Sequence, residues 1–439
     1  MECDAIVIGA GAAGLAAARC LAARAFRVIV LEARDRVGGR AFSVPTPRSL
    51  TPAELGAEFI HGRGLETMAL LREASLAAVD TGGDSWRCTA RGDLERDEEE
   101  FLSAATLFGE ANSLMQDESV ETFLRRFAGD PLQRDRAEAA RQFVEGFDAA
   151  DPAIASARAI AFEWRSGTDW SSTRPIGGYA PLFACLQDDC VARGVDVRLS
   201  TIVTGITWQR GAVDVQLSAA HGAGETLRTR AVVITLPAGV LQERSGEGSV
   251  TFHPQLPSTK YRALEKIVMG DVVKVALLFE SPFWENVHGG RYYDAGFFRG
   301  NGPPFGVYWT QVPVRTELVV AWAGGPRATA LRAHATDDLV ARARDTFGEL
   351  LGAPDECAAA FDRGYTHDWR RDPFSRGAYT YLAVGGEGAR EALAAPLDNT
   401  LFFAGEGTSL DGQAGTVNGA LESGVRAAAE VAECLNRRS

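Results

Sequence analysis

The N-terminus constrains the fold more than any other part of this sequence, because a short apolar run leads directly into a glycine-rich turn. Residues 4–8 predict a buried strand, an alanine-rich helix follows to about residue 24, and residues 28–31 predict a second strand. The glycines of a GxGxxG pattern between the first strand and the helix are Gly9, Gly11 and Gly14. Such glycines allow a tight turn, a close approach of a pyrophosphate to the backbone, and close packing of the helix on the strand. This βαβ unit therefore predicts a dinucleotide site.

The acid at the end of the second strand supports the same prediction. Glu32 stands where a carboxylate can accept hydrogen bonds from ribose hydroxyls. The start of the helix offers free N–H groups and a partial positive charge to the phosphates. An acid at this position disfavours the 2′-phosphate of NADP, but the motif by itself does not distinguish NAD from FAD.

Length and charge exclude several other classes of protein. A chain of 439 residues is too long for one simple core, so we expect two domains or one domain with large insertions. Its 46% hydrophobic and 23% charged residues are typical of soluble globular proteins. The formal net charge of −13 argues against nucleic acid as the main partner, since phosphate binding requires a basic surface.

Cysteine usage and hydropathy indicate the compartment. Seven cysteines without a CxxC pair predict reduced thiols rather than a disulfide framework or a zinc site. The six histidines form no HxxxH cluster, so we expect no metal. No apolar run approaches the ~18 residues that cross a bilayer, and the N-terminus lacks the pattern of a signal peptide. We therefore expect a cytoplasmic protein with no membrane partner.

The order of the expected elements indicates a domain that is assembled from scattered pieces. Residues 195–235 predict short strands, so a strand-forming pattern like that of the N-terminus recurs in the middle of the chain. Apolar periodicity predicts helices at 64–75, 131–148, 326–333 and 336–351, strands at 274–279, 318–322 and 401–404, and a final helix from about residue 416. Such a domain is completed only when the C-terminal part docks on the N-terminal strand.

The residues that follow Glu32 resemble a known family. The segment Glu32-Ala-Arg34-Asp-Arg36-Val-Gly38-Gly39-Arg40 resembles the extended signature of the flavin amine oxidase family. The segments that resemble further motifs of this family, in the same order, are Glu54-Leu-Gly56-Ala57-Glu58-Phe-Ile-His61-Gly62, Pro175–Tyr179, Ala231–Pro237, Asp271–Phe279 with Trp284, Asp368-Trp369, Gly377–Tyr381, Phe403–Thr408 and Gly415–Gly424. Each motif is modest alone, but the ordered set spans the whole chain and is specific.

The resemblance implies a fold and an activity. The fold is α/β, with a Rossmann-type FAD-binding domain of residues 1–62, 172–246 and 395–439. The other domain, residues 63–171 and 247–394, binds substrate and pairs helices with a mixed sheet. The activity is oxidation of an amine C–N bond, by hydride transfer to flavin N5, hydrolysis of the imine to an aldehyde or ketone, and reoxidation by O2 with release of H2O2. Expected substrates are alkyl amines, polyamines or secondary amines; the oligomeric state stays open, with a homodimer as one option.

Lys274 is the first candidate for a catalytic residue. It interrupts an apolar strand, in a chain whose basic residues are otherwise almost all arginine. A desolvated lysine can lose its proton, whereas arginine cannot. The resemblance implies that this lysine holds a water near flavin N5 and assists reoxidation by O2. The alternative is an edge-strand lysine that reaches solvent.

Trp369 and Tyr379 are expected to shape the substrate site beside the flavin. The resemblance places Ala378 where the monoamine oxidases carry a cysteine that is bonded to the flavin, so FAD should be bound non-covalently. Thr416 stands where those enzymes have a second tyrosine, which disfavours a small aromatic monoamine as substrate. The alternative for the two aromatic residues is an ordinary place in the core.

The resemblance also implies contacts to FAD. Backbone N–H groups of Thr416 and Val417 would meet the pyrimidine edge of the flavin, Glu406 the ribityl–pyrophosphate part, and Val203 the adenine. The residues expected to bind the cofactor are Gly9, Gly11, Gly14, Glu32, Arg34, Gly39, Arg40, Gly56, Ala57, Glu58, Val203, Trp369, Gly405, Glu406, Thr416 and Val417.

Two residues of the Gly56 loop are candidates for contact with substrate. His61 stands where polyamine oxidases carry a histidine or an acid, and its ordinary pKa near 6.5 would let it take up the proton that an amine must lose. Glu58 is expected to bind a distal ammonium. Tyr379 and Thr416 complete the expected substrate contacts. A hydrogen bond from His61 to FAD or to its own loop is an equal alternative.

Other activities of related folds remain as alternatives. An L-amino-acid oxidase would need an arginine for the substrate carboxylate, and Phe59 occupies that place. A dehydrogenase of the protoporphyrinogen oxidase or desaturase type shares the N-terminal motif, but the segments around Lys274 and Tyr379 disfavour it. A chromatin-directed demethylase would need appended domains, and a flavin-binding protein without turnover would be expected to lose Lys274 or Trp369.

Overall fold

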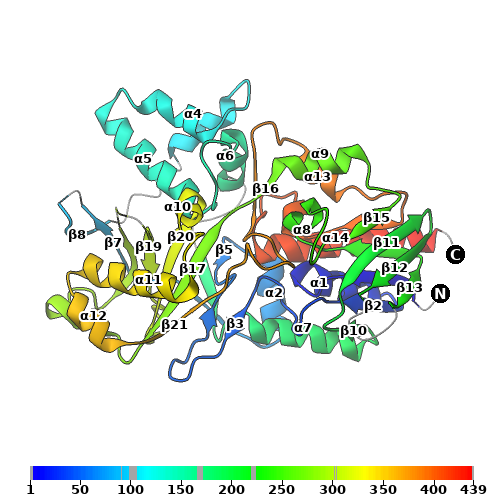
Figure 1. The fold of residues 1–439 in the computed structure, drawn as a ribbon, viewed down its shortest axis with the longest axis horizontal. Coiled ribbons are helices and arrows are strands. Elements are labelled where there is room, and N and C mark those ends of the chain that lie inside the picture. The colour runs from blue at the N-terminus through cyan, green and yellow to red at the C-terminus, as the bar shows by residue number, and fades with distance from the viewer. Residues whose placement is uncertain are drawn as a thin grey trace.

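The computed structural model describes residues 3–89, 91–97, 106–165, 172–218, 224–300, 302 and 304–437. A sheet of parallel strands lies close to both termini, on the right in Figure 1. The strands in spatial order are β10 (Asp196–Arg198), β2 (Val28–Leu31), β1 (Ala5–Ile8), β14 (Ala231–Ile234) and β23 (Leu401–Phe403). Every residue of β1, β2, β14 and β23 is buried, as parallel strands covered on both faces require.

Helices from both ends of the chain cover one face of this sheet. The helices are α1 (Ala12–Ala22), α2 (Leu65–Glu73), α7 (Ala180–Ala192) and α14 (Val417–Asn436). A Cβ atom on Gly14 would lie 1.9 Å from the Gly9 carbonyl oxygen, and one on Gly424 would lie 2.2 Å from that of Ala13. Only glycine permits these approaches, so the expected close packing of α1 and the docking of the C-terminal helix are both confirmed.

The other face of the sheet is covered by strands and short helices. The second sheet has the order β13 (Thr226–Thr229), β12 (Ala212–Leu217), β11 (Val203–Gln209) and β15 (Thr251–His253). The nearby elements are α8 (Ala238–Gln242), α9 (Ser258–Lys266), α13 (Ala389–Ala394) and the strand pair β16 (Ile267–Met269) and β22 (Thr380–Leu382). These elements share an apolar core with β1 and β14, which fixes their position on the sheet.

A mixed sheet forms the opposite lobe, on the left in Figure 1. Its strands in order are β21 (Phe361–Thr366), β17 (Val272–Phe279), β20 (Leu318–Gly324), β19 (Val307–Trp309), β18 (Ala295–Arg299), β7 (Asp84–Cys88) and β8 (Leu94–Arg96). Only the pair of β7 and β18 is parallel. The helices α10 (Gly325–Ala330), α11 (Thr336–Leu351) and α12 (Pro354–Ala360) belong to the same lobe. The predicted mixed sheet is therefore confirmed.

A group of helices lies above the junction of the two lobes in Figure 1. Its members are α4 (Val120–Leu124), α5 (Pro131–Gly146) and α6 (Ala157–Arg165), which share a core with Tyr381. The predicted helix over 131–148 ends at Gly146, a residue that favours helix termination. The helix predicted at 326–333 is α10, which ends at Ala330 because a turn leads from there into α11.

Two small sheets join segments that are distant in the sequence. They are the pair β3 (Ser43–Val44) with β4 (Ala53–Glu54), and the sheet of β5 (Ile60–His61), β9 (Ser172–Pro175) and β6 (Ala78–Asp80). β6 pairs with β9, and β15 pairs with β11, so two sheets cross the expected boundaries at 62/63 and 246/247. The division into two domains stays a prediction. Within the described ranges, no helix is long and apolar enough to cross a membrane.

Candidate active site

A cavity of about 820 Å³ is lined by residues of both the parallel sheet and the mixed sheet. Its wall includes the residues that follow β1, β2, β14 and β23, as expected at the carboxyl ends of parallel strands. Its other wall includes residues of β17, β19 and β20. All expected site residues except Gly14 line this cavity: Gly9, Gly11, Glu32, Arg34, Gly39, Arg40, Gly56, Ala57, Glu58, His61, Val203, Lys274, Trp369, Tyr379, Gly405, Glu406, Thr416 and Val417. The structure therefore brings together residues that span most of the chain.

The nucleotide end of the cavity has the groups that a dinucleotide requires. The Glu32 carboxylate accepts hydrogen bonds from the backbone N–H groups of Ala10 (2.7 Å) and Arg34 (3.0 Å), which hold it at the end of β2. Around Gly11, a Cβ atom would meet only the Gly39 Cα, at 3.9 Å, so the backbone stays open toward the cavity. These features fit a pyrophosphate at the start of α1 and a ribose beside Glu32.

A second acid is held in the wall of the cavity. The Glu406 carboxylate forms an ion pair with Arg40 (2.8 Å) and accepts hydrogen bonds from the Thr380 hydroxyl (2.6 Å) and the Gly415 N–H (3.2 Å). Burial alone would raise the pKa of Glu406, but the charge of Arg40 and the Thr380 hydrogen bond bring it below its ordinary value. Glu406 is therefore ionised and ties β22 to the glycine-rich loop before α14.

Lys274 lies inside the cavity rather than at an edge open to solvent. It belongs to β17, its side chain is 3% exposed, and it pairs in register with Trp322 of β20. Its Nζ donates to the Gly56 carbonyl (3.0 Å) and to Glu58 Oε2 (2.7 Å). The ammonium group therefore sits between the mixed sheet and the loop that carries Gly56.

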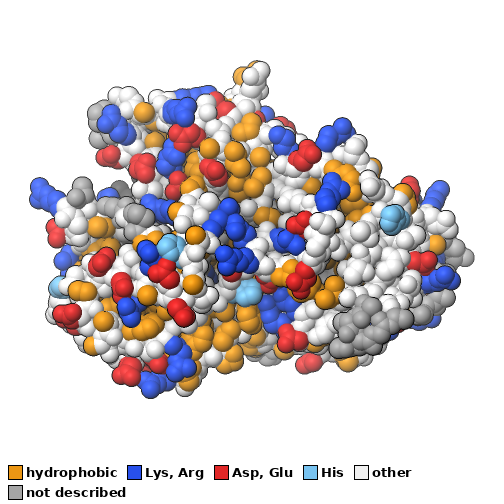
Figure 2. All heavy atoms as spheres, in the orientation of Figure 1, with side chains coloured by type: hydrophobic (Ala, Val, Ile, Leu, Met, Phe, Trp, Pro, Cys, Tyr) orange, Lys and Arg blue, Asp and Glu red, His pale blue; other side chains and the backbone are white. Residues whose placement is uncertain are grey.

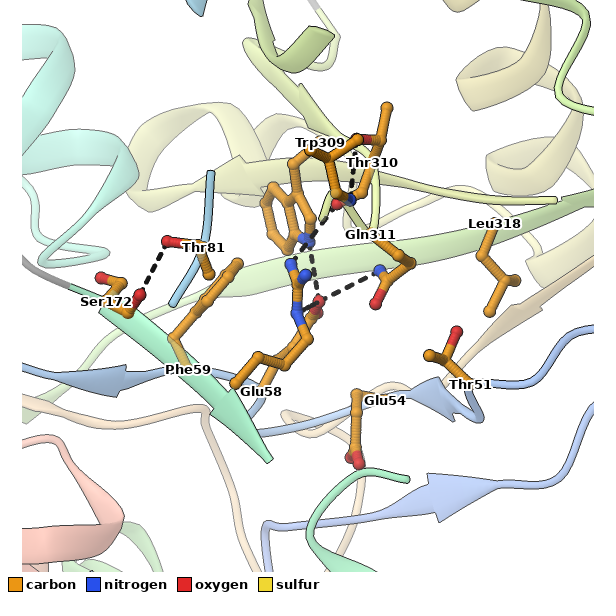
Figure 3. A network of polar contacts seen from close by, with 12 residues as sticks. Thr51, Glu54, Glu58, Phe59, Thr81, Ser172, Trp309, Thr310, Gln311 and Leu318 are labelled. Atoms are coloured by element: carbon orange, nitrogen blue, oxygen red, sulfur yellow. Dashed lines mark hydrogen bonds and ion pairs between the residues drawn. The ribbon is translucent and has the colours of Figure 1, made fainter. Parts of the chain in front are cut away.

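Figure 3 shows the network that holds Glu58 from the other side. Its Oε1 accepts from Trp309 Nε1 (3.0 Å) and Gln311 Nε2 (3.2 Å), and Arg174 Nε lies 2.9 Å away. Burial would raise the pKa of Glu58, but the charges of Lys274 and Arg174 lower it to about 2. Cationic and hydrogen-bond-donating groups of the protein contact both carboxylate oxygens of Glu58. These contacts favour a role for Glu58 in positioning Lys274 over the expected contact with a distal ammonium group of the substrate.

Two aromatic side chains that were expected at the site, Trp369 and Tyr379, line the cavity. Trp369 is buried and donates from Nε1 to the Leu55 carbonyl (2.7 Å), and its ring lies against Gly56. The Tyr379 hydroxyl donates to the Phe147 carbonyl (2.5 Å), and its ring lies against Gly415. Burial raises the pKa of Tyr379, so its hydroxyl keeps its proton. The two rings have fixed orientations around the cavity.

His61 is held at the edge of the same space. Its Nδ1 is 3.0 Å from the Ser172 hydroxyl, and its ring meets Phe147 edge-on with 5.0 Å between centroids. Burial lowers the pKa of His61 to about 4, so the ring is neutral at pH 7. A neutral imidazole with this pKa is a weak proton acceptor, which disfavours the expected role in proton uptake.

The start of the last helix faces the cavity. Thr416 is the N-cap residue of α14, and its hydroxyl accepts a hydrogen bond from the Gly419 N–H at 2.9 Å. Val417 follows as the first helical residue, and both line the cavity. The free N–H groups of this helix terminus therefore point a partial positive charge toward the cavity.

Several residues of the cavity wall or of the Glu58 network were not expected from the sequence. Arg174 and Trp309 complete the Glu58 network, while Phe143, Phe147 and Asp148 line the cavity at the end of α5. None of them belongs to a motif with a recognisable spacing. Asp148 follows a helix with ordinary amphipathic periodicity, so only tertiary packing could show that its carboxylate is buried.

Comparisons with known proteins place the chain among flavoproteins. The model of the family described as flavin containing amine oxidoreductase matches residues 12–432. Polyamine oxidase 3 of Oryza sativa subsp. japonica is 29% identical over 97% of this chain and 88% of its own length. Lysine-specific histone demethylase 1 homolog 3 of Arabidopsis thaliana is 28% identical over 98% of this chain, which spans only 30% of that relative. The structure of cyclohexylamine oxidase from Brevibacterium oxydans superposes with a TM-score of 0.81, at 23% identity over 100% of both chains, and so shares the fold.

Proposed function

Because the chain belongs to the flavin-containing amine oxidoreductase family, it is an FAD-dependent enzyme that oxidises amines, and we propose that its substrate is an alkyl amine, a polyamine or a related secondary amine. The resemblance seen in the sequence motifs is thereby confirmed. The alternatives of an L-amino-acid oxidase and of a protoporphyrinogen oxidase or desaturase type are not favoured by the relatives and structures that match.

The buried pair of Lys274 and Glu58 carries this proposal. Bound FAD supplies a ring that accepts a hydride from the carbon next to the amine nitrogen. Lys274, fixed by Glu58 and the Gly56 carbonyl, would hold a water beside that ring and so assist reoxidation by O2. The ionised Glu58 carboxylate accepts a hydrogen bond from Lys274 Nζ and so fixes the position of this point donor.

The remaining residues would bind and orient the cofactor. The start of α1 would meet the pyrophosphate, Glu32 the ribose and Val203 the adenine, while the ion pair of Arg40 and Glu406 lines the same cavity. The N–H groups of Thr416 and Val417 would favour negative charge on the pyrimidine edge of the ring. Ala378 offers no thiol, so we propose that FAD is held without a covalent bond.

The aromatic side chains of the cavity would contact the substrate and exclude water from it. Trp369 and Tyr379 present fixed ring faces, which suit an alkyl chain and an ammonium group. Since only a neutral amine has a lone pair to support hydride loss, the site must remove a proton from a group whose pKa is near ~10. The resulting imine would hydrolyse to an aldehyde or ketone.

We propose a small-molecule amine and O2 as the reactants, without nucleic acid, and a place in the cytoplasm. Support comes from the net charge of −13 and from seven cysteines, all within the described ranges, none of which forms a disulfide in the structure. Figure 2 shows acidic and basic side chains mixed over one face of the molecule. A homodimer stays a prediction, which light scattering of the purified protein would decide.

A peroxide-release screen tests the proposed function. The purified yellow protein is mixed with putrescine, spermidine, spermine, tyramine, benzylamine and free amino acids. We expect H2O2 from alkyl amines or polyamines, and release of intact FAD on denaturation. Turnover of amino acids alone would favour the L-amino-acid oxidase alternative. No signal from any amine, with the flavin intact, would refute the substrate assignment.

A further inference from the structure

Five carboxylates line the cavity, and four of them have a cationic partner within the protein. Their ion pairs are Glu32 with Arg34 (3.8 Å), Glu58 with Lys274 (2.7 Å), Glu163 with Arg390 (3.0 Å) and Glu406 with Arg40 (2.8 Å). The fifth is Asp148. Among the described residues, no lysine, arginine or histidine forms an ion pair with it.

Asp148 is a buried residue that the local fold holds in place. It lies two residues beyond α5, and its side chain faces the cavity with the residue only 8% exposed. Trp164 of α6 donates one N–H to it, at 3.1 Å from Oδ2 and 3.4 Å from Oδ1. One neutral donor leaves most of the acceptor capacity of a carboxylate unused. The next residue, Ala149, is fully buried with φ of 51°, so the turn that presents Asp148 is tightly constrained.

The surroundings of Asp148 suit an organic cation. Phe147 stacks on Phe143 with 5.0 Å between centroids, and Phe143 meets Trp164 edge-on at the same distance. Tyr379 lines the same cavity, and its hydroxyl donates a hydrogen bond to the Phe147 carbonyl, which ties it to this group of rings. Aromatic faces attract cations and exclude water. Burial of an ionised carboxylate without a cationic partner is unfavourable in free energy. An ammonium ion among these rings would supply that partner.

We propose that Asp148 binds a primary ammonium group of the substrate, within the ring of Phe143, Phe147, Trp164 and Tyr379. This inference rests on the proposed function, because it names the group that recognises the amine. The ammonium could be the reacting end of a monoamine or the second end of a diamine, and both present the same chemistry. Asp148 thus takes the place that the sequence suggested for Glu58, whose carboxylate the protein itself neutralises.

Binding of an ammonium group to Asp148 should be coupled to release of a proton. Burial and the nearby charge of Glu163 raise the pKa of Asp148 well above its ordinary value. Within the described part of the chain, the titratable groups that interact with it are Glu163, itself paired with Arg390, and Tyr379. A bound cation favours the ionised carboxylate, so binding breaks the O–H bond of a protonated Asp148 and releases that proton to solvent. Cation binding should therefore tighten as pH rises, while the ammonium stays charged.

A cation that cannot be oxidised tests binding without turnover. The carbon next to nitrogen in tert-butylamine carries no hydrogen, so no hydride can leave it. We expect calorimetric titration of the FAD-loaded enzyme to show tert-butylammonium binding that strengthens with pH, and Asp148→Asn to weaken it by about tenfold or more. tert-Butyl alcohol has the same shape without charge, and its weaker binding should not change in Asp148→Asn.

A matched control variant and a second Asp148 variant support the interpretation of the binding measurement. Asp135→Asn makes the same change at an exposed position of α5 and should leave the tert-butylammonium affinity unaltered. If Asp148→Asn fails to retain FAD, Asp148→Ala removes the carboxyl group with a smaller side chain. Wild-type binding that is independent of pH, or equal affinity in wild type and a folded Asp148 variant, would overturn the proposal.

Turnover then distinguishes the two sources of the ammonium group. If Asp148 binds the reacting end, Asp148→Asn raises the KM for butylamine and putrescine alike and shifts the pH profile. If it binds the second end, KM rises for putrescine and stays the same for butylamine. Failure of the proposed function would appear differently, as wild-type protein that binds tert-butylammonium but releases no peroxide with any amine.

Discussion

At the scale of single residues, this protein depends on charges that are buried in pairs. Lys274 and Glu58 are 3% and 2% exposed, and each satisfies the other inside the cavity. Such a pair contributes little to stability relative to apolar side chains, but removal of one partner leaves an uncompensated charge. The pair is therefore better explained by the position it gives to the ammonium group than by its effect on folding.

Replacement of Lys274 by methionine should separate the two halves of the reaction. Lys274→Met keeps an unbranched side chain of nearly the same length and removes the amino group that would hold a water beside the ring. In stopped-flow measurements, we expect reoxidation by O2 to slow far more than anaerobic reduction by amine. Equal slowing of both half-reactions would contradict the role assigned to Lys274.

Replacement of Glu58 by glutamine should destabilise the protein in a pH-dependent way. The folded state lowers the pKa of Glu58 to about 2, below its unfolded value near ~4.3, so its contribution is present above the unfolded pKa and is lost as pH falls toward 2. We expect Glu58→Gln to lose on the order of 3 kcal/mol in urea unfolding at pH 7, and the difference from wild type to shrink below about pH 4.

An exposed ion pair provides the control for that measurement. Glu280 lies 3.6 Å from Arg48, with both side chains more than half exposed. Glu280→Gln should change the unfolding free energy by about 1 kcal/mol or less. A similar small change in Glu58→Gln would show that Lys274 finds another partner.

At the scale of elements, contact between the first and last helices completes the nucleotide site. α1 follows the glycine-rich turn, and α14 begins at the cavity and packs along α1. The approach is close enough that the backbone of Ala13 touches Gly424. The position of the α14 N-terminus against the cavity therefore depends on a glycine about two turns into the helix.

A methyl group at Gly424 should disturb this contact. The Cβ atom of Gly424→Ala would lie 2.2 Å from the Ala13 carbonyl oxygen, so the helices must move apart. We expect a loss of about 1–3 kcal/mol in stability and weaker retention of FAD, measured by thermal unfolding and by flavin released on gel filtration. Gly109→Ala, where a Cβ meets nothing within 4 Å, should leave both unchanged. Unaltered stability in Gly424→Ala would mean that the two helices adapt without cost.

At the scale of the whole molecule, one cavity is built from segments that are hundreds of residues apart. Its wall takes residues from the N-terminal turn, the α5–α6 region, the mixed sheet and the last helix. A ligand that fills it would bind only the folded chain, because no single segment contains the site. Folding stability and cofactor occupancy should therefore be coupled.

Removal of FAD should lower the stability of the protein as a whole. At a free FAD concentration of 100 Kd, binding to one site contributes about 2.7 kcal/mol. We expect apoprotein to unfold at a lower temperature than holoenzyme, and its Tm to rise with added FAD. Riboflavin, which lacks the pyrophosphate and adenosine, should restore less. A Tm that does not respond to FAD would contradict the nucleotide site at the start of α1.

The sequence alone determined the parts of this protein that depend on local backbone geometry or on motifs with a fixed spacing. The turn at Gly9, the helix that starts from it and the start of the last helix near residue 416 follow from residues close by in the chain, and Glu32 follows at a fixed spacing, so their pattern is readable from the sequence. Tertiary structure decided what each buried charge meets. Glu58 is engaged by Lys274 and Arg174, and Asp148 faces the cavity without a cation, because contacts between distant segments set these partners and no local pattern encodes them.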